Sequence, residues 1–166
     1  MYPAGHLGIS LLLYAPIALF LGLNGFIIFA ALGFLMVGAF ATLPDKDMNA
    51  PILSHRGISH TVASAILFGV VVGFVAIFFV PIFSLIGIPA APVVGFTFFM
   101  GAFVVLTHLL GDSITPSGVK PFAPFSSWKI SFDYVRAENR VANLVLWAIG
   151  WLVTILVFLL VIGSLV

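Results

Sequence analysis

The chain has 166 residues, of which 63% are hydrophobic and 7% are charged, whereas an ordinary soluble domain is about 25% charged. This composition excludes an ordinary soluble domain and predicts a protein whose main solvent is lipid. The net charge of +1 gives no reason to expect nucleic-acid binding, and the absence of cysteine excludes disulfides and thiolate metal sites. The length fits one unit, so we expect residues 1–166 to form a single transmembrane helical domain.

Three long stretches contain no Asp, Glu, Lys, Arg or His, namely residues 7–44, 61–107 and 141–166. One crossing of a bilayer needs about 20 apolar residues, and Gly, Asn and Pro residues within the first two stretches mark turns. The sequence therefore predicts an all-α integral membrane protein, a bundle of about five transmembrane helices. The expected helices are residues 7–22, 26–43, 60–80, 92–111 and 141–164.

This helix order places the charged side chains at one membrane face. A chain that starts at His6 and crosses five times returns to that face at residues 45–60 and 108–140, whereas the turns near Asn24 and Gly87 lie at the other face. All six Lys and Arg residues fall on the first face, which the positive-inside rule makes cytoplasmic. We expect a multi-pass protein of the inner or plasma membrane, with its N-terminus and polar residues inside and its C-terminus outside.

Residues that can bind metal ions gather at the helix ends on this face. His108 and Asp112 are four residues apart and project from one side of a helix, which should face the bundle because an ionisable group is costly against lipid. Imidazole and carboxylate without sulfur suit Zn²⁺ first, with Mn²⁺ or Fe²⁺ as alternatives. There are more candidates than one tetrahedral ion needs, so two or three ions are possible. The predicted ligands are His6, Asp45, Asp47, His55, His60, His108 and Asp112.

Each candidate also has a plainer interpretation. His6 could contact a lipid headgroup or cap a helix, and Asp45 could pair with Lys46. Asp112 could pair with Arg56, which could itself be a positive-inside anchor. The metal hypothesis is favoured because all four histidines of the chain fall at one depth on one face.

Two further patterns concern lipid and packing. The loop at about 113–140 mixes Lys and Arg with Phe, Trp and Tyr, which is typical of an interfacial segment; it is either a plain anchor, or a lid or guide for an anionic lipid-borne substrate. Gly69 and Gly73 have the spacing that lets membrane helices approach closely. They predict either internal packing or a homodimer.

Four motifs occur in a familiar order: "HLGIS", "LPDKD", "HRGISHT" and "HLLGDSITPSGVKPFAPF". Together they resemble the membrane-bound metal-dependent hydrolase family often called YdjM-like, from His6 to about Phe125. The resemblance implies a multi-helix inner-membrane protein with hydrolase activity. It also implies a distant similarity to zinc-dependent phospholipase C and single-strand nucleases, which cleave phosphoesters with clustered zinc ions. The ligands implied by the motifs are His6, Asp45, Asp47, His55 or His60, His108 and Asp112.

The leading functional hypothesis is a metal-dependent hydrolase that cleaves a phosphoester of a lipid or other amphiphile at the cytoplasmic face. Asp45 or Asp47 would accept the proton of the attacking water, and Arg56 would bind the phosphate. An ion- or proton-coupled transporter is one alternative, although transporters place coupling sites near the bilayer midplane. A non-catalytic scaffold with a structural metal ion is another.

Overall fold

The computed structural model describes residues 1–49 and 57–165, and the elements of this part of the chain are helical. Pro3–Leu23, Ile27–Lys46, Ala90–Ser113 and Arg140–Gly163 are long and apolar enough to cross a membrane, and Val62–Ile77 is a shorter apolar helix. The predicted all-α membrane bundle is therefore confirmed. The elements are α1 Pro3–Leu23, α2 Ile27–Phe40, η1 Pro44–Asn49, η2 Ile58–His60, α3 Val62–Ile77, α4 Val80–Ser84, α5 Ala90–Ser113 and α6 Arg140–Gly163, where η marks a 3₁₀ helix.

Several helix boundaries differ by a few residues from the sequence prediction, and proline explains two of them. The expected helix 60–80 ends earlier, at Ile77, and the short α4 follows it. Pro81 has no backbone N–H, and its ring would collide with the carbonyl of Ile77 if the helix continued. The first helix begins at Pro3 rather than residue 7, because proline is well suited to the first turn of a helix.

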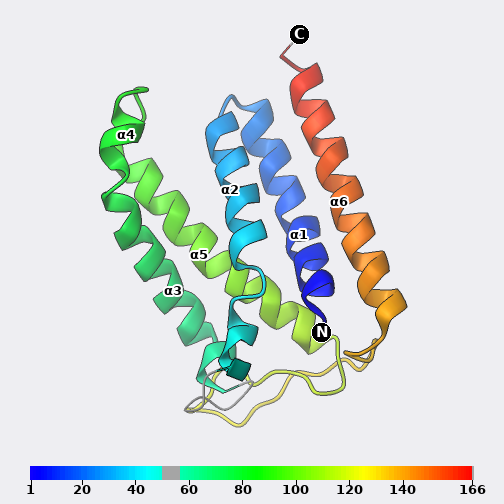
Figure 1. The fold of residues 1–166 in the computed structure, drawn as a ribbon. Coiled ribbons are helices and arrows are strands. Elements are labelled where there is room, and N and C mark those ends of the chain that lie inside the picture. The colour runs from blue at the N-terminus through cyan, green and yellow to red at the C-terminus, as the bar shows by residue number, and fades with distance from the viewer. Residues whose placement is uncertain (50–56, 166) are drawn as a thin grey trace.

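The helices run between two ends of the molecule (Figure 1). The N-terminus, η1, η2 and the segment between α5 and α6 lie at one end, whereas α4, the α1–α2 turn and the C-terminus lie at the other. Gly25 and Gly87, in the turns of the far end, have φ values of 83° and 77°, which glycine adopts without steric cost. The predicted gathering of helix ends at one face therefore matches the arrangement in space.

Glycine allows the closest helix contacts. A Cβ atom on Gly8 of α1 would collide with the backbone of Leu146 in α6, and a Cβ on Gly69 of α3 would lie 2.7 Å from the carbonyl oxygen of Phe98 in α5. Such small residues let transmembrane helices pack backbone against backbone. Gly69 and Gly73 both contact α5. This contact is the internal packing that we gave as one of the two explanations for their spacing.

Buried hydroxyl groups such as those of Ser10, Tyr14 and Thr107 form hydrogen bonds with each other or with the backbone. The hydroxyl of Tyr14 donates to the carbonyl oxygens of Phe29 and Ala30 at 3.2 and 3.1 Å, and Ser10 Oγ lies 2.8 Å from Thr107 Oγ1. A buried polar group without such a partner would be costly in hydrocarbon. These contacts tie α1 to α2 and to α5.

The segment between α5 and α6 is attached to the helix ends by backbone hydrogen bonds. Phe132 N donates to Ser113 O at 2.8 Å, and Val62 N donates to Pro121 O at 2.8 Å. Val119 and Ile130 form an isolated antiparallel bridge across the segment. The segment therefore folds against α5 and the start of α3, at the end of the bundle where the predicted ligands lie.

Candidate metal centre

Four of the predicted ligands lie in one cluster, which we call the His–Asp cluster. His6 of α1, Asp45 of η1, and His108 and Asp112 of α5 each offer a ligand atom, and these atoms lie within 4.8 Å of one another. His60 of η2 joins the cluster, because its Nε2 lies 3.4 Å from Asp45 Oδ1 and 3.5 Å from Asp112 Oδ2. Folding has thus brought together side chains from four elements.

The two carboxylates occupy the middle of the His–Asp cluster. His6 Nε2 lies 3.6 Å from Asp45 Oδ2 and 3.6 Å from Asp112 Oδ1. His108 Nε2 lies 3.3 Å from Asp45 Oδ1 and 3.8 Å from Asp112 Oδ2. The Nε2 atoms of His6, His60 and His108 therefore all face the same pair of carboxylates.

The tautomer of His108 is set by a backbone contact. Its Nδ1 lies 2.9 Å from the carbonyl oxygen of Ala41, and a carbonyl can only accept, so Nδ1 carries the hydrogen. In the neutral ring the Nε2 lone pair then points at the carboxylates, and this buried Nε2 has no hydrogen-bond partner among the described residues. A lone pair that faces two carboxylates is unfavourable unless Nε2 is protonated or a cation lies between them. A backbone carbonyl that accepts a hydrogen bond from the other ring nitrogen is a common partner of a metal-binding histidine.

His60 is held by the start of α3. Thr61 caps this helix: its side chain accepts from Ser64 N at 3.1 Å, while Ser64 Oγ accepts from Thr61 N at 3.2 Å. This reciprocal arrangement fixes the chain direction at a helix start. The ring of His60 also has its Nδ1 2.9 Å from Ser59 Oγ, so both ring nitrogens of His60 have a polar neighbour.

Small residues and hydroxyls of the neighbouring turns position His6. Gly111 leaves space for its ring, since a Cβ there would lie 2.8 Å from His6 Nδ1. The Ser10–Thr107 hydrogen bond, one turn away, fixes α1 against α5. The residue types Gly111, Ser10 and Thr107 do not by themselves indicate a metal site in the sequence. The contact of the Ala41 carbonyl could not be predicted either, because it is made by a backbone atom.

A cation lies against the His–Asp cluster in the structure. The amino group of Met1 is 3.3 Å from Asp112 Oδ1 and 3.1 Å from His6 Nε2. The buried carboxylates attract positive charge at this position. The set of nitrogen and oxygen donors, and the orientation of His108, fit a divalent ion of the zinc, manganese or iron type.

Comparison with known proteins identifies the family. The sequence matches the family described as YdjM inner membrane protein over residues 1–166. The chain belongs to this family. No curated protein and no solved structure gives a match. Membership of this family, predicted from the motifs around the histidines, is thus confirmed, and so is the prediction of a multi-pass membrane protein. The distant similarity to zinc-dependent phospholipase C and nucleases stays a prediction.

Three predicted site residues of this YdjM-family protein cannot be placed. His55 and Arg56 lie outside the described residues, and Asp47 lies in η1 with its side chain outside the described part. Their roles as ligand, phosphate-binding residue and base stay predictions. The same holds for the cytoplasmic orientation of the His–Asp cluster.

Proposed function

We propose that this YdjM-family protein is a membrane-embedded metal-dependent hydrolase that cleaves a phosphoester of a lipid or other amphiphile at the cytoplasmic face. The observation that carries the proposal is the convergence of three histidine Nε2 atoms on the carboxylates of Asp45 and Asp112. The cluster contains more nitrogen and oxygen donor atoms than a single ion pair would use. They suit one or more divalent ions, with Zn²⁺ as the first expectation.

The two carboxylates differ in their exposure to solvent, which suggests different roles. A divalent ion held here would lower the pKa of a bound water toward neutrality and polarise a phosphoryl oxygen. The side chain of Asp112 is fully buried, so we assign it to ion binding. The side chain of Asp45 is 19% exposed, so it can receive a water molecule and accept its proton. Asp47 and Arg56 keep the roles of second base candidate and phosphate-binding residue.

The position of the His–Asp cluster supports an amphiphilic substrate. It lies at the end of apolar helices that can cross a bilayer (Figure 1). The outer faces of these helices expose large apolar side chains such as Phe20, Leu35 and Phe158, which suit contact with lipid. A phosphoester at the membrane surface would therefore lie at about the depth of the cluster.

A structural metal site is the second candidate, and burial favours it. His6, His60, His108 and Asp112 have side chains with no exposed surface, and they come from three separate helical elements. An ion bound among them would tie these elements together in the way that structural zinc ions do. The transporter alternative has less support, because the buried polar side chains deep in the described helices are uncharged, such as Ser10, Thr97 and Thr154.

One set of measurements tests the proposal. The protein is purified in detergent, bound metals are counted by elemental mass spectrometry, and hydrolysis is assayed on phospholipid and nucleotide panels. The test variants are Asp112→Asn and His60→Ala. Asp133→Asn is the matched control, because Asp133 is an exposed acid with a φ of 53° that asparagine also adopts readily.

The enzyme is supported if the test variants lose both metal and turnover while the control keeps both. Bound metal without turnover on any panel would instead favour the structural site. A wild-type protein that binds no divalent metal would contradict both candidates.

A further inference from the structure

The side chain of Ser59 contacts the buried ring of His60 at the nitrogen that does not face the carboxylates. Ser59 Oγ lies 2.9 Å from His60 Nδ1, whereas Nε2 of the same ring lies 3.4 Å from Asp45 Oδ1 and 3.5 Å from Asp112 Oδ2. A neutral histidine that binds an ion through Nε2 carries its hydrogen on Nδ1. That nitrogen then needs an acceptor, and the hydroxyl of Ser59 is placed to be one.

The same contact selects one of the two orientations of the His60 ring. Turning an imidazole by 180° about its Cβ–Cγ bond exchanges Nδ1 with Cδ2 and Nε2 with Cε1. In the turned orientation, carbon atoms would face both the hydroxyl of Ser59 and the carboxylates. A ring carbon can neither bind an ion nor accept a hydrogen bond. The hydrogen bond with Ser59 therefore favours the orientation in which Nε2 can bind.

Hydroxyl groups at the start of α3 hold the backbone around Ser59. Ser64 Oγ donates to the carbonyl oxygen of Ser59 at 2.8 Å, and Thr61 Oγ1 donates to that of Ile58 at 2.8 Å. Thr61 and Ser64 also form the reciprocal cap of this helix. The position of the Ser59 side chain is thus set by the helix start, which is the rigid support that a metal ligand needs to keep its geometry.

His108 is held in a comparable way through its own Nδ1, which lies 2.9 Å from the carbonyl oxygen of Ala41. His60 and His108 therefore each present Nδ1 to an oxygen atom and Nε2 to the same pair of carboxylates. The carbonyl of Ala41 belongs to the backbone and stays in place whatever the side chain. The hydroxyl of Ser59, in contrast, can be removed by substitution.

We infer that Ser59 is a positioning residue for His60. Its hydroxyl accepts a hydrogen bond from Nδ1, which directs Nε2 at the bound ion and makes this nitrogen a better electron-pair donor. The plainer interpretation is that the hydroxyl only satisfies a buried nitrogen and so stabilises the fold. The inference rests on the metal centre of the proposed function, and it holds whether the ion is catalytic or structural.

Three substitutions of Ser59 separate its hydroxyl from the space that the side chain occupies. Ser59→Ala removes the hydroxyl, Ser59→Thr keeps it, and Ser59→Val fills the same space as threonine without it. The affinity for Zn²⁺ is measured in detergent by competition against a metal-sensitive dye. We expect Ser59→Ala and Ser59→Val to bind Zn²⁺ about 10-fold more weakly than the wild type, and Ser59→Thr to bind it nearly as tightly.

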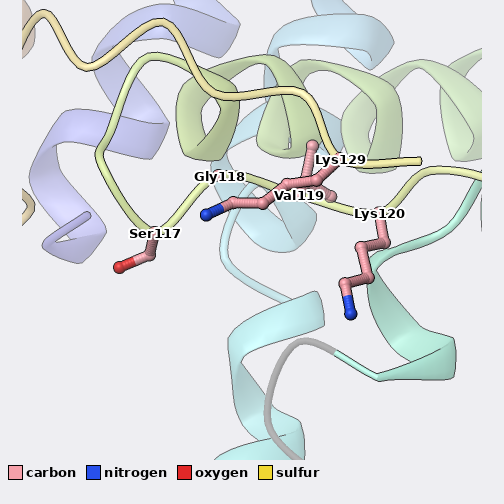
Figure 2. Close-up of a pocket in the computed structure, with 5 residues that line it drawn as sticks. All are labelled: Ser117, Gly118, Val119, Lys120 and Lys129. Carbon is pink, nitrogen blue, oxygen red and sulfur yellow. The ribbon is translucent and has the colours of Figure 1, made fainter. Parts of the chain in front are cut away.

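Two other serines provide matched controls. Ser113 directly follows the predicted ligand Asp112, but its hydroxyl donates to Leu110 O of its own helix at 2.7 Å. Ser117 is exposed and lines a pocket on the segment between α5 and α6, where Figure 2 shows its hydroxyl pointing away from Lys129. Ser113→Ala and Ser117→Ala should both keep the Zn²⁺ affinity of the wild type.

Two further measurements distinguish positioning from a purely structural role. Co²⁺ is bound in place of Zn²⁺, and its visible absorption reports the number and geometry of the ligands. Ser59→Ala and Ser59→Val should change this spectrum, whereas Ser59→Thr should keep it. Thermal unfolding without metal measures the stability of the fold itself, which should be equal in Ser59→Thr and Ser59→Val.

The inference is overturned if Ser59→Ala and Ser59→Val bind Zn²⁺ as tightly as the wild type, or if Ser59→Thr binds it as weakly as Ser59→Val. An equal loss of affinity in either control variant would also overturn it, because the effect would then not be specific to His60. Lower metal-free stability in Ser59→Val with an unchanged Co²⁺ spectrum would show the structural role instead. A wild-type protein that binds no divalent ion would contradict the proposed function itself, which is a different result from equal binding by the wild type and the Ser59 variants.

Discussion

The rings of His6 and His108 are stacked, with centroids 3.7 Å apart and planes inclined by 11°. The stack brings α1 and α5 together at the end of the bundle and directs both Nε2 atoms at Asp45 and Asp112. Two parallel imidazoles in this arrangement offer adjacent nitrogen donors to a bound cation. The geometry of the stack therefore decides how well the His–Asp cluster can hold an ion.

Gly111→Ala should disrupt the His–Asp cluster without changing any ligand. The new methyl group would lie 2.8 Å from His6 Nδ1, so the ring must move away from its stacked position. We expect metal affinity to fall about 10-fold or more, as for other changes in the groups that orient metal ligands. Competition titration against a metal-sensitive dye measures this affinity.

Gly95→Ala is the control for Gly111→Ala. Gly95 lies in the same helix, and a Cβ there would meet no atom within 4 Å. This variant should bind metal as the wild type does. Equal affinities for all three proteins would show that the position of His6 does not matter for ion binding.

Metal ions should stabilise the wild-type protein against heat, and His108→Ala should remove most of this effect. A ligand that binds only the folded state at 100 times its dissociation constant adds about 2.7 kcal/mol to the free energy of unfolding. His108→Ala deletes an Nε2 atom that lies 3.3 Å from Asp45 Oδ1. Thermal unfolding in detergent, with and without added Zn²⁺, measures the difference.

Thr97→Val serves as the control for His108→Ala, because Thr97 is a buried residue of the same helix whose hydroxyl donates to the backbone carbonyls of Val93 and Val94. It should change the baseline stability slightly and keep the full response to metal. An unchanged response in His108→Ala would count against this residue as a ligand.

Gly69→Ala should destabilise the bundle. Its methyl group would lie 2.7 Å from the carbonyl oxygen of Phe98, and overpacking of this kind costs roughly 1–3 kcal/mol. Gly38→Ala, where a Cβ meets nothing within 4 Å, should leave the fold intact. Denaturation in mixed micelles compares the two variants.

The same variants separate internal packing from the homodimer that the Gly69–Gly73 spacing also allows. If Gly69→Ala abolishes a dimer on size-exclusion chromatography but keeps the wild-type stability, the pair acts between chains. If stability falls while the oligomeric state is unchanged, the pair acts within one chain.

Membrane orientation can be tested with single cysteines, because the natural chain contains none. Ser127→Cys lies in the exposed segment between α5 and α6, and Ile86→Cys lies in the exposed turn at the opposite end. If the charged end is cytoplasmic, a membrane-impermeant maleimide added to intact cells should label Ile86→Cys only. Labelling of Ser127→Cys alone would place the His–Asp cluster on the outer face, and permeabilised cells provide the control in which both are labelled.

The apolar stretches of the sequence were sufficient to predict most of the fold. A bilayer permits few ways to satisfy the backbone, so apolar stretches of sufficient length become helices that cross it. For the same reason the ends of successive helices alternate between faces, which is why His6, Asp45, His60, His108 and Asp112 could be assigned to one end. The end of α3 at Ile77, three residues before the expected end, shows where such a prediction is imprecise, since the number of apolar residues does not fix the exact end of a helix.

Tertiary structure decided which of these end residues meet and how they are oriented. The sequence predicts that His108 and Asp112 lie on one side of their helix, because they are four residues apart. The contact of His6 with His108, in contrast, depends on the packing of α1 against α5 at Gly111. The hydrogen on His108 Nδ1 is set by the Ala41 carbonyl, a backbone atom of a distant helix end. Sequence alone thus determined the depth and the face of the polar residues, because these follow from crossing a bilayer. Only the packed structure determined the shape of the His–Asp cluster, because distances of a few ångströms depend on the contacts between helices.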